Sequence, residues 1–348
     1  MKIENDIKLD FNDVLFRPKR STFSSRSEVN VERTFNFKHS KRSWTGVPII
    51  SSNMDTVSSI EMFKSLSKYK CITCFHKYIN INEIITACKS GYSSEYFMLS
   101  TGITDKDYTK LIEDYEQLQS NGIDLAFICI DVANGYMFKL VEFCKKIRKQ
   151  FPKTTIVAGN VVSRELVEEL VINGQVDIIK VGIGSGAVCT TRLQTGVGIP
   201  QFSAVMECAD AAHGLGGTII SDGGICYPGD VSKAYGGGAD FVMLGSMLSG
   251  HTECSGEVIE ENGKQYKLFY GMSSDTAMNK YHGGVASYRS SEGKTVKVPY
   301  KGPVSETMNN VLGGVRSTCT YIGATRLKDM HKCATFVRVN RQVNNFYK

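Results

Sequence analysis

The sequence predicts a (β/α)8 barrel. Eight short apolar runs of strand-like composition alternate with polar stretches of helical spacing, and such runs are typical of parallel strands buried on both faces. Strands that alternate with helices indicate βαβ units, and eight units predict a closed barrel. The length of 348 residues suits one large barrel or two ordinary domains. The runs are VPIISSN from Val47, CITCF from Cys71, YFMLSTG from Tyr96, LAFICIDVAN from Leu125, TTIVAGNVV from Thr154, VDIIKVGIG from Val176, GTIISDGG from Gly217 and ADFVMLGSM from Ala239.

The segments between the runs carry helical patterns. Pro228 and the glycines 236–238 bracket one expected helix. Two other segments keep apolar residues on a single helical face. These residues are Leu140, Val141, Cys144 and Ile147 in the first segment, and Leu166, Val167, Leu170 and Val171 in the second.

One loop of the predicted barrel is longer than the others. Successive runs start 22 to 29 residues apart, except that 41 residues separate Val176 from Gly217. The loops at the carboxyl ends of the strands build the active site of such barrels. The chemistry is therefore expected in the loop after the sixth strand.

Two segments flank the barrel in what we expect to be a single catalytic domain. Residues 1–45 lead in, residues 46–250 hold the barrel strands and helices, and residues 251–348 trail out. The trailing part begins with a predicted hairpin, EVIEENGKQYKLF, that turns at Asn262-Gly263. A polar stretch from about His282 to Gly302 is interpreted as a mobile flap.

Composition narrows the class of protein. With 42% hydrophobic and 22% charged residues the chain is typical of soluble globular proteins, and no apolar run approaches the length of a membrane span. The net charge of +6 is dispersed along the chain, which fits an anionic small ligand and no nucleic acid. Eleven cysteines and a charged amino terminus without a secretion signal favour the cytoplasm. The CxxC of Cys71 and Cys74 is expected to be structural, because an offset of three places the thiols on opposite strand faces.

The long sixth loop carries the strongest candidate nucleophile. It reads GIGSGAVCTTR over residues 182–192, and its glycines let the backbone approach an anion or supply carbonyl ligands to a cation. Cys189 follows these glycines and stands beside Arg192, whose charge would lower the thiol pKa. Most of the eleven cysteines would be inert, but its position at a strand's carboxyl end favours Cys189 as a nucleophile.

Glycine-rich turns follow the seventh and eighth strands. SDGG covers residues 221–224 and MLGS covers residues 243–246. Phosphate groups commonly bind these two loops in such barrels, so the turns predict a phosphorylated ligand, with Asp222 available for ribose hydroxyls. Tight turns without a ligand are the alternative.

The remaining motifs give weaker signals. SEGKTV over residues 291–296 contains GKT, but Tyr288 stands where a phosphate-binding P-loop needs glycine. Glu292 in that stretch is either a general acid or base on the flap or a solvated surface residue. His76, His213 and His282 are not spaced as metal ligands and are interpreted as satisfied surface or core histidines.

Taken together, the motifs resemble the family of IMP dehydrogenases and GMP reductases over about residues 10–339. NMDTV, DVANGY and CTTR resemble the reductase branch, and no spacing leaves room for the inserted regulatory module of most dehydrogenases. The motifs are DFNDVLFRPKRST from Asp10, NMDTV from Asn53, DVANGY from Asp131, AGNVV from Ala158, GIGSGAVCTTR, ISDGG, FYGMSS from Phe269, SEGKTVKVPYKGP and STCTYIGA from Ser317.

The resemblance implies that GMP and NADPH give IMP, ammonia and oxidised cofactor. Cys189 would attack carbon 2 of the guanine, and Thr191 with Glu292 would protonate the leaving amine. A hydride from NADPH would then enter that carbon and release the sulfur. A homotetramer with the cofactor near a subunit boundary is implied as well.

The resemblance also assigns binding residues. Those for the nucleotide are Asp222, Gly223, Gly224, Gly245, Ser246, Gly271, Met272, Ser273, Arg289 and Ser290. Those for the cofactor, with a contribution expected from a neighbouring subunit, are Ser25, Arg26, Lys77, Asp131, Val132, Ala133, Ser317, Thr318, Cys319 and Thr320. Carbonyls of Gly184, Gly186, Cys189 and Arg192 would hold a monovalent cation such as K⁺.

Three departures from the reductase pattern and two rival functions stay open. Ser185 and Ala187 stand where reductases often have proline and serine, and Ser246 replaces a usual glycine. The nearest rival is an IMP dehydrogenase without the regulatory module, whose flap would carry a paired Arg and Tyr as base. A nucleotide-binding regulator without turnover is the rival from another class.

Overall fold

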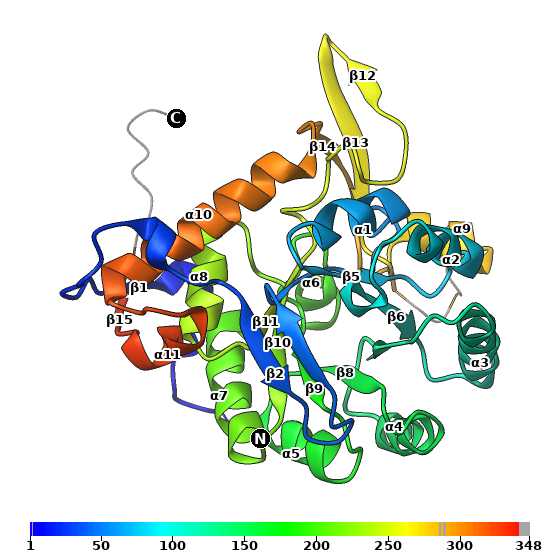
Figure 1. The fold of residues 1–348 in the computed structure, drawn as a ribbon, viewed down its shortest axis with the longest axis horizontal. Coiled ribbons are helices and arrows are strands. Elements are labelled where there is room, and N and C mark those ends of the chain that lie inside the picture. The colour runs from blue at the N-terminus through cyan, green and yellow to red at the C-terminus, as the bar shows by residue number, and fades with distance from the viewer. Residues whose placement is uncertain (2, 285–286, 288–289, 341–348) are drawn as a thin grey trace.

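The computed structural model describes residues 1–340, apart from residues 2, 285–286 and 288–289. Eight parallel strands form a closed barrel in the order β10-β11-β4-β5-β6-β7-β8-β9, which confirms the predicted (β/α)8 fold (Figure 1). Every predicted run contains one of these strands. They are β4 (Ile49–Ser51), β5 (Ile72–Phe75), β6 (Phe97–Thr101), β7 (Phe127–Asp131), β8 (Thr155–Val161), β9 (Ile178–Val181), β10 (Thr218–Asp222) and β11 (Phe241–Leu244).

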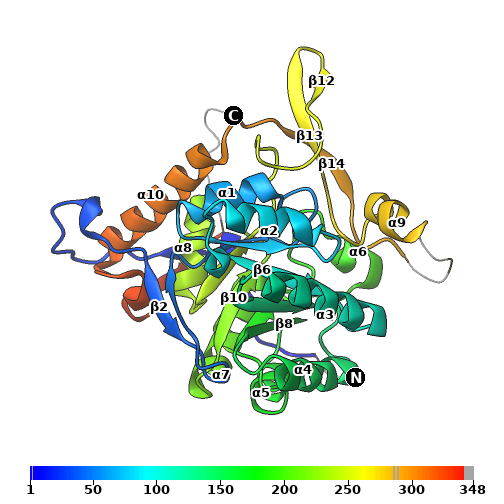
Figure 2. The same ribbon diagram turned by 45° about the vertical axis from the view of Figure 1, so that its right-hand side comes forward.

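Helices surround the barrel, as Figure 2 shows for α2 to α5 along one side. The predicted apolar faces of α4 and α5 lie in the main core, and the long sixth loop folds into α6 and α7. None of the helices described is both long and apolar enough to cross a membrane. Their bounds are α1 (Ile60–Ser67), α2 (Ile81–Lys89), α3 (Asp105–Ser120), α4 (Phe138–Gln150), α5 (Arg164–Ile172), α6 (Thr191–Thr195), α7 (Gln201–Gly214), α8 (Pro228–Gly236), α9 (Asp275–His282), α10 (Val304–Ile322) and α11 (Met330–Cys333).

A small antiparallel pair closes the bottom of the barrel. β2 (Arg33–Asn36) and β3 (Ser43–Gly46) bring the side chains of Phe35, Phe37 and Trp44 under the amino ends of the strands. Phe35 stacks on Phe241 with ring centroids 4.4 Å apart, and Phe37 meets Phe127 edge to face. The interior is therefore a packed core that opens only at the carboxyl ends of the strands.

The CxxC residues behave as the strand period predicts. Cys71 lies in the core between strands and helices, whereas Cys74 lies in the core inside the barrel. Both are buried, and burial raises the pKa of each thiol above its usual value.

The trailing segment forms a second sheet above the barrel mouth. β12 (Ile259–Glu261) and β13 (Lys264–Tyr270) make the predicted hairpin at Asn262-Gly263, and this hairpin projects from the body in both views (Figures 1 and 2). β14 (Thr295–Pro299) pairs with β13, so the prediction of a mobile flap up to Gly302 is wrong for these five residues. The local sequence TVKVP did not predict this strand, because the strand with which it pairs, β13, is distant along the chain. The flap is therefore limited to residues 283–294, which join α9 to β14.

The chain is also tied together at its beginning and end. β1 (Val14–Phe16) pairs with β15 (Phe336–Arg338), and the rings of Phe16 and Phe336 lie 4.5 Å apart. The lead-in and the closing segment thus lie together beside α8 and α11.

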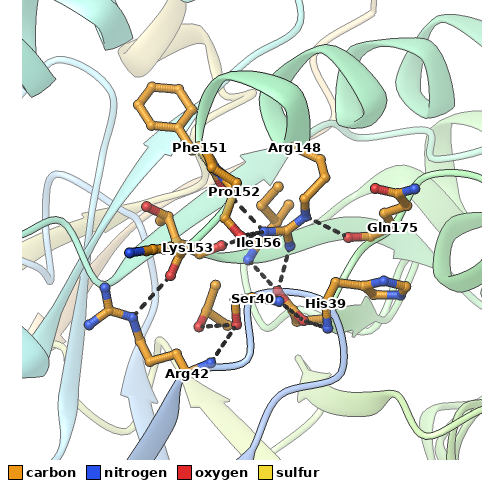
Figure 3. Close-up of polar contacts among 12 residues, drawn as sticks. His39, Ser40, Arg42, Arg148, Phe151, Pro152, Lys153, Ile156 and Gln175 are labelled. Atoms are coloured by element: carbon orange, nitrogen blue, oxygen red, sulfur yellow. Dashed lines mark hydrogen bonds and ion pairs between the residues drawn. The ribbon is translucent and has the colours of Figure 1, made fainter.

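A buried ion pair fixes the bottom of the barrel. Arg148 in α4 donates to Asp177 Oδ2 (2.6 Å), and both side chains are almost fully buried. Backbone amides of His39, Ser40 and Ile156 also donate to Asp177, and Arg148 donates to the carbonyl of Gln175. Figure 3 shows Arg148, His39 and Ser40 converging from different elements. The pair therefore joins the lead-in loop to α4 and the start of β9.

We expect Arg148→Met to lower the free energy of unfolding by about 3–5 kcal/mol, because the substitution leaves the Asp177 charge buried without a cation. Urea denaturation measures this loss. Arg164→Met is the matched control, since Arg164 forms an exposed pair with Asp210 and should leave the urea midpoint nearly unchanged. Equal losses in the two variants would contradict the assignment.

Candidate active site

A pocket of about 260 Å³ opens at the carboxyl ends of the barrel strands. It brings together residues from several strand ends, from the sixth loop and from the segment after β13, as expected for a site in this fold. Its lining contains the predicted nucleophile and many of the predicted binding residues. The lining residues are Ser52, Asn53, Met54, Asp131, Val132, Ala133, Asn160, Lys180, Gly182, Ile183, Gly184, Gly186, Val188, Cys189, Thr191, Asp222, Gly271, Met272, Ser273 and Glu292.

Cys189, Thr191 and Glu292 form a hydrogen-bonded relay in this pocket. The Cys189 thiol lies 3.1 Å from Thr191 Oγ1, and the Thr191 hydroxyl donates to Glu292 Oε2 at 2.7 Å. A hydroxyl that accepts from a thiol and donates to a carboxylate can pass a proton between them. Glu292 is thus a pocket residue and not a solvated surface carboxylate.

Backbone contacts hold Glu292 against the sixth loop. The amide of Thr190 donates to the Glu292 carbonyl (2.9 Å), and the amide of Lys294 donates to the Val188 carbonyl (2.9 Å). The Glu292 amide in turn donates to the Ser273 carbonyl (3.3 Å). These contacts place the carboxylate over Thr191, although 101 residues separate the two.

A buried lysine joins two predicted binding carboxylates. Lys180 Nζ lies 2.7 Å from Asp131 Oδ1 and 2.8 Å from Asp222 Oδ2, with 4% of its side chain exposed. Burial alone would lower the pKa of Lys180, but the two carboxylates outweigh it and the pKa lies well above its usual value. Burial likewise opposes ionisation of Asp131, yet the charge of Lys180 holds the pKa of that carboxyl below its usual value. Both charges therefore persist at neutral pH.

Two asparagines extend this charged row across the pocket. Asn53 Nδ2 donates to Asp131 Oδ2 (2.8 Å), and Asn160 Nδ2 donates to Asp222 Oδ2 (2.9 Å). Asn160 Oδ1 is buried and has no hydrogen-bond partner among the described residues. Such an orphaned acceptor fits a hydroxyl or amide donor on a bound ligand.

The predicted nucleotide residues divide into two groups. Asp222, Gly271, Met272 and Ser273 line the pocket, whereas Gly223, Gly224, Gly245 and Ser246 form the turns beside it. Gly223 has φ +96°, and a Cβ there would lie 2.5 Å from Ser185 Oγ, so the SDGG turn requires glycine. Ser290 is exposed and bonds Gln194, and Arg289 lies outside the described residues.

The predicted cofactor residues lie at separate places on the chain. Asp131, Val132 and Ala133 line the pocket, and Lys77 pairs with Asp107 at 2.9 Å. Arg26 and Ser317 instead line a second depression beside α10, close to Ser25 and Thr320 in sequence. Thr318 bonds Ser232 and Cys319 is fully buried in the core, so neither side chain faces that depression freely. Within a single chain, the predicted cofactor residues in the pocket and those beside α10 therefore do not form one continuous site.

The predicted cation ligands lie close together in the sixth loop. Gly184 has φ +80°, and a Cβ there would lie 2.6 Å from Arg192 Cγ, so Gly184 and Arg192 are in contact. The Gly186 carbonyl accepts from the Cys189 amide at 3.0 Å. Neutral carbonyl oxygens on a tight glycine loop are chemically suited to a monovalent cation. No cluster of three or more His, Cys, Asp or Glu side chains that could hold a metal occurs in the part of the chain that the structure describes.

The three histidines that the sequence analysis interpreted as satisfied differ in their hydrogen bonding. His213 bonds Asp240 and His282 bonds Tyr78, both at 2.8 Å, as satisfied histidines should. His76 is different, because its buried Nδ1 atom has no hydrogen-bond partner in the described part of the chain. Burial lowers the pKa of His76 to about 4, so the ring is neutral near pH 7.

The sequence reasoning did not assign Ser52, Asn53, Met54, Asn160 or Lys180 to the site. Asn53 and Asn160 lie in the motifs NMDTV and AGNVV, which carried the family resemblance but received no role. Lys180 is the single charge inside the apolar run IIKV, and a charge buried in a barrel strand is a signal for a polar partner.

The fold and the pocket define the chain as a (β/α)8-barrel protein whose mouth carries a cysteine, a threonine and a glutamate joined by hydrogen bonds. Residues 8–344 match the family model described as the IMP dehydrogenase / GMP reductase domain, and the chain belongs to this family. Curated relatives named GMP reductase are similar over 100% of this chain and 99% of their own lengths. They include proteins from Photobacterium profundum (56% identical), Klebsiella pneumoniae (56%) and Salmonella typhi (55%).

We expect Lys180→Met to raise the pKa of Asp131, because Lys180 is the cation that lowers it. In the wild-type protein this carboxylate contributes stability above the unfolded-state pKa of 3.8 and loses that contribution as the pH falls through its lower folded-state value. In the variant the folded-state pKa moves up towards or above 3.8, so this stabilising contribution and its loss in acid should become smaller or disappear. Titration of ¹³C-labelled aspartate carboxyls measures the pKa. Lys110→Met, which removes only the α3 pair with Asp114, should leave Asp131 unchanged.

Proposed function

We propose that this chain catalyses the NADPH-dependent reductive deamination of GMP to IMP in purine nucleotide salvage. The observation that carries the proposal is the Cys189–Thr191–Glu292 relay, which faces a pocket also lined by Asp222 and Asp131. The balanced reaction is GMP + NADPH + 2H⁺ → IMP + NADP⁺ + NH₄⁺. The identity of 55–56% to full-length proteins named GMP reductase supports this substrate and direction.

The first step uses the relay to remove the amine. The Cys189 sulfur bonds to carbon 2 of the guanine while the proton of the thiol passes to the Thr191–Glu292 pair. The Thr191 hydroxyl then protonates the 2-amino group and is reprotonated by Glu292, and the bond from carbon 2 to nitrogen breaks. Ammonia leaves, and the purine stays bound to Cys189 as a thioimidate.

The second step replaces sulfur by hydrogen. NADPH would supply, when bound, the hydride for carbon 2 that no side chain can provide. The carbon–sulfur bond breaks, its electron pair returns to Cys189, and IMP is released. Asp222 and the SDGG turn hold the ribose and phosphate through both steps, and the ion pairs with Lys180 fix the orientation of Asp222 and Asp131.

The pocket lining supports a cofactor position beside Asp131. Asp131, Val132 and Ala133 line the same pocket as Cys189, and the orphaned Asn160 Oδ1 accepts a hydrogen bond there once ligands are bound. Ser25, Arg26 and Ser317–Thr320 of a second copy would complete the site in a homotetramer. Lys77, now paired with Asp107, and Arg26 would favour the extra phosphate of NADPH. Carbonyls of Gly184, Gly186, Cys189 and Arg192 would hold K⁺.

An IMP dehydrogenase without a regulatory module is the alternative function. Its flap would supply a paired Arg and Tyr to activate water, whereas the short stretch 280–302 of this sequence contains Tyr288-Arg289 without a recognisable motif of that kind. Tyr288 and Arg289 lie outside the described residues. The reductase assignment is favoured because full-length relatives that are 55–56% identical are named GMP reductase. We propose a cytoplasmic location for the enzyme.

We expect purified protein to release ammonia and oxidise NADPH in equal amounts when GMP is supplied. Parallel assays with each purine nucleotide and NAD or NADP measure the preference. Oxidation of IMP with NAD would identify the dehydrogenase instead. Binding of GMP without turnover in any assay would identify a nucleotide-binding regulator.

We expect Cys189→Ala to bind GMP but to have no turnover, because no thioimidate can form. Glu292→Gln should slow deamination by about 10²–10⁴-fold, the usual contribution of general acid–base catalysis, with little change in GMP affinity. Rapid quenching with mass spectrometry of the Cys189 adduct measures both effects. Cys88→Ala, in a half-buried thiol on α2, is the control and should retain full activity. Adduct formation at the normal rate in Glu292→Gln would contradict the role given to Glu292.

A further inference from the structure

Asp55, a carboxylate that does not line the pocket, binds the base of the flap to the barrel. Asp55 lies between β4 and α1, directly after the pocket residues 52–54, and is 3% exposed. Its Oδ2 atom accepts hydrogen bonds from Tyr270 Oη (2.7 Å), Tyr281 Oη (2.6 Å) and Lys280 Nζ (2.8 Å). Three donors on one buried oxygen, one of them cationic, hold their elements in a fixed geometry.

The three donors lie at both ends of a short pocket-lining segment. Tyr270 ends β13 and directly precedes Gly271–Ser273, which line the pocket. Lys280 and Tyr281 are in the last turn of α9, immediately before the flap. Tyr281 also stacks on Tyr78 with ring centroids 3.9 Å apart, which adds an apolar contact to the loop after β5. Asp55 therefore holds both ends of the segment 270–282 in place.

This segment is the support on which Glu292 rests. The Glu292 amide donates to the Ser273 carbonyl, Ser274 and Gly293 form a parallel β-bridge, and the Gly271 amide donates to Lys294. A continuous series of contacts thus runs from Asp55 through residues 270–274 to Glu292, and from there to Thr191 and Cys189.

The charges in this cluster are stable near neutral pH. Burial would raise the pKa of Asp55, but hydrogen bonds from Lys280, Tyr281 and Tyr270 outweigh it and the pKa lies below its usual value. Burial and the bond to Asp55 raise the pKa of Tyr270 to about 12. His76, which faces the cluster from the loop after β5, is neutral because its pKa is about 4. The cluster thus keeps one anion and one cation.

We propose that Asp55 is a positioning residue for the flap: by holding Tyr270, Lys280 and Tyr281 it places Glu292 over Thr191 for amine protonation. This inference rests on the proposed deamination of GMP, and Asp55 acts through Glu292 without touching the substrate.

The test is a double-mutant cycle between Asp55→Asn and Glu292→Gln. Asp55→Asn keeps the shape but removes the charge that pairs with Lys280, so deamination should slow by about tenfold or more while the KM for GMP changes by less than about threefold. In the Glu292→Gln background the same change should have almost no further effect, because the group it positions is already disabled. Independent, multiplying effects in the two backgrounds would overturn the proposal.

Asp177→Asn is the matched control for a general loss of stability. Asp177 is also a buried aspartate with a cationic partner, but it lies at the opposite end of the barrel. It should lower the urea midpoint at least as much as Asp55→Asn and leave kcat unchanged. An equal loss of kcat in Asp177→Asn would assign the effect of Asp55 to stability alone.

Hydrogen exchange separates this inference from the proposed function. Without any nucleotide, backbone amides of residues 271–282 should exchange faster in Asp55→Asn than in the wild-type protein, while those of β6 and β7 should not. Unchanged exchange in 271–282 would overturn the anchor role even if the wild-type protein reduces GMP. Faster exchange in Asp55→Asn, together with no GMP reductase activity in the wild-type protein, would instead retain the anchor and reject the proposed function.

Discussion

Closure of eight parallel strands is the constraint on which the rest of the structure depends. In a closed parallel barrel all carboxyl ends meet at one mouth, so side chains that are far apart in sequence become neighbours there. Asp131 and Asp222 end β7 and β10, Lys180 is the penultimate residue of β9, and the three side chains meet within hydrogen-bond distance. The opposite mouth is closed by Phe35, Phe37 and Trp44. The pocket thus lies at one end of the barrel, and the aromatic side chains that close the barrel lie at the other.

Buried ion pairs at the two ends have different consequences. The Arg148–Asp177 pair at the bottom is surrounded by backbone carbonyls and amides that complete its hydrogen bonding. The ion pairs of Lys180 at the top face a pocket, and the neighbouring acceptor Asn160 Oδ1 has no hydrogen-bond partner among the described residues. An unpaired acceptor in a pocket wall can receive a hydrogen bond from a ligand, whereas the fully bonded Arg148–Asp177 pair stabilises the elements that it joins.

Sequence patterns predicted the parts of this molecule that depend on local periodicity. All eight strands, the hairpin turn at Asn262-Gly263 and the helix that starts at Pro228 follow from short apolar patterns and turn residues. Cys189 could be singled out because a strand and a glycine-rich loop precede it directly. β14 was missed because its stability depends on pairing with β13, across an intervening helix and the flap. Lys180 and Asp55 were missed for a similar reason, since their partners lie 42 and 215–226 residues away.

The same geometry explains one of the departures from the reductase pattern. The Ser185 hydroxyl donates to the backbone carbonyl of Asp222 (3.2 Å), so the serine ties the sixth loop to the end of β10. At position 246 the contact with Lys301 Nζ (3.3 Å) is made by the backbone carbonyl, which any residue supplies, and nothing in the structure explains the serine side chain. Ala187 is exposed. The hydrogen bonds that join Cys189, Thr191 and Glu292 involve none of these three positions, so the three substitutions leave the geometry of this series intact.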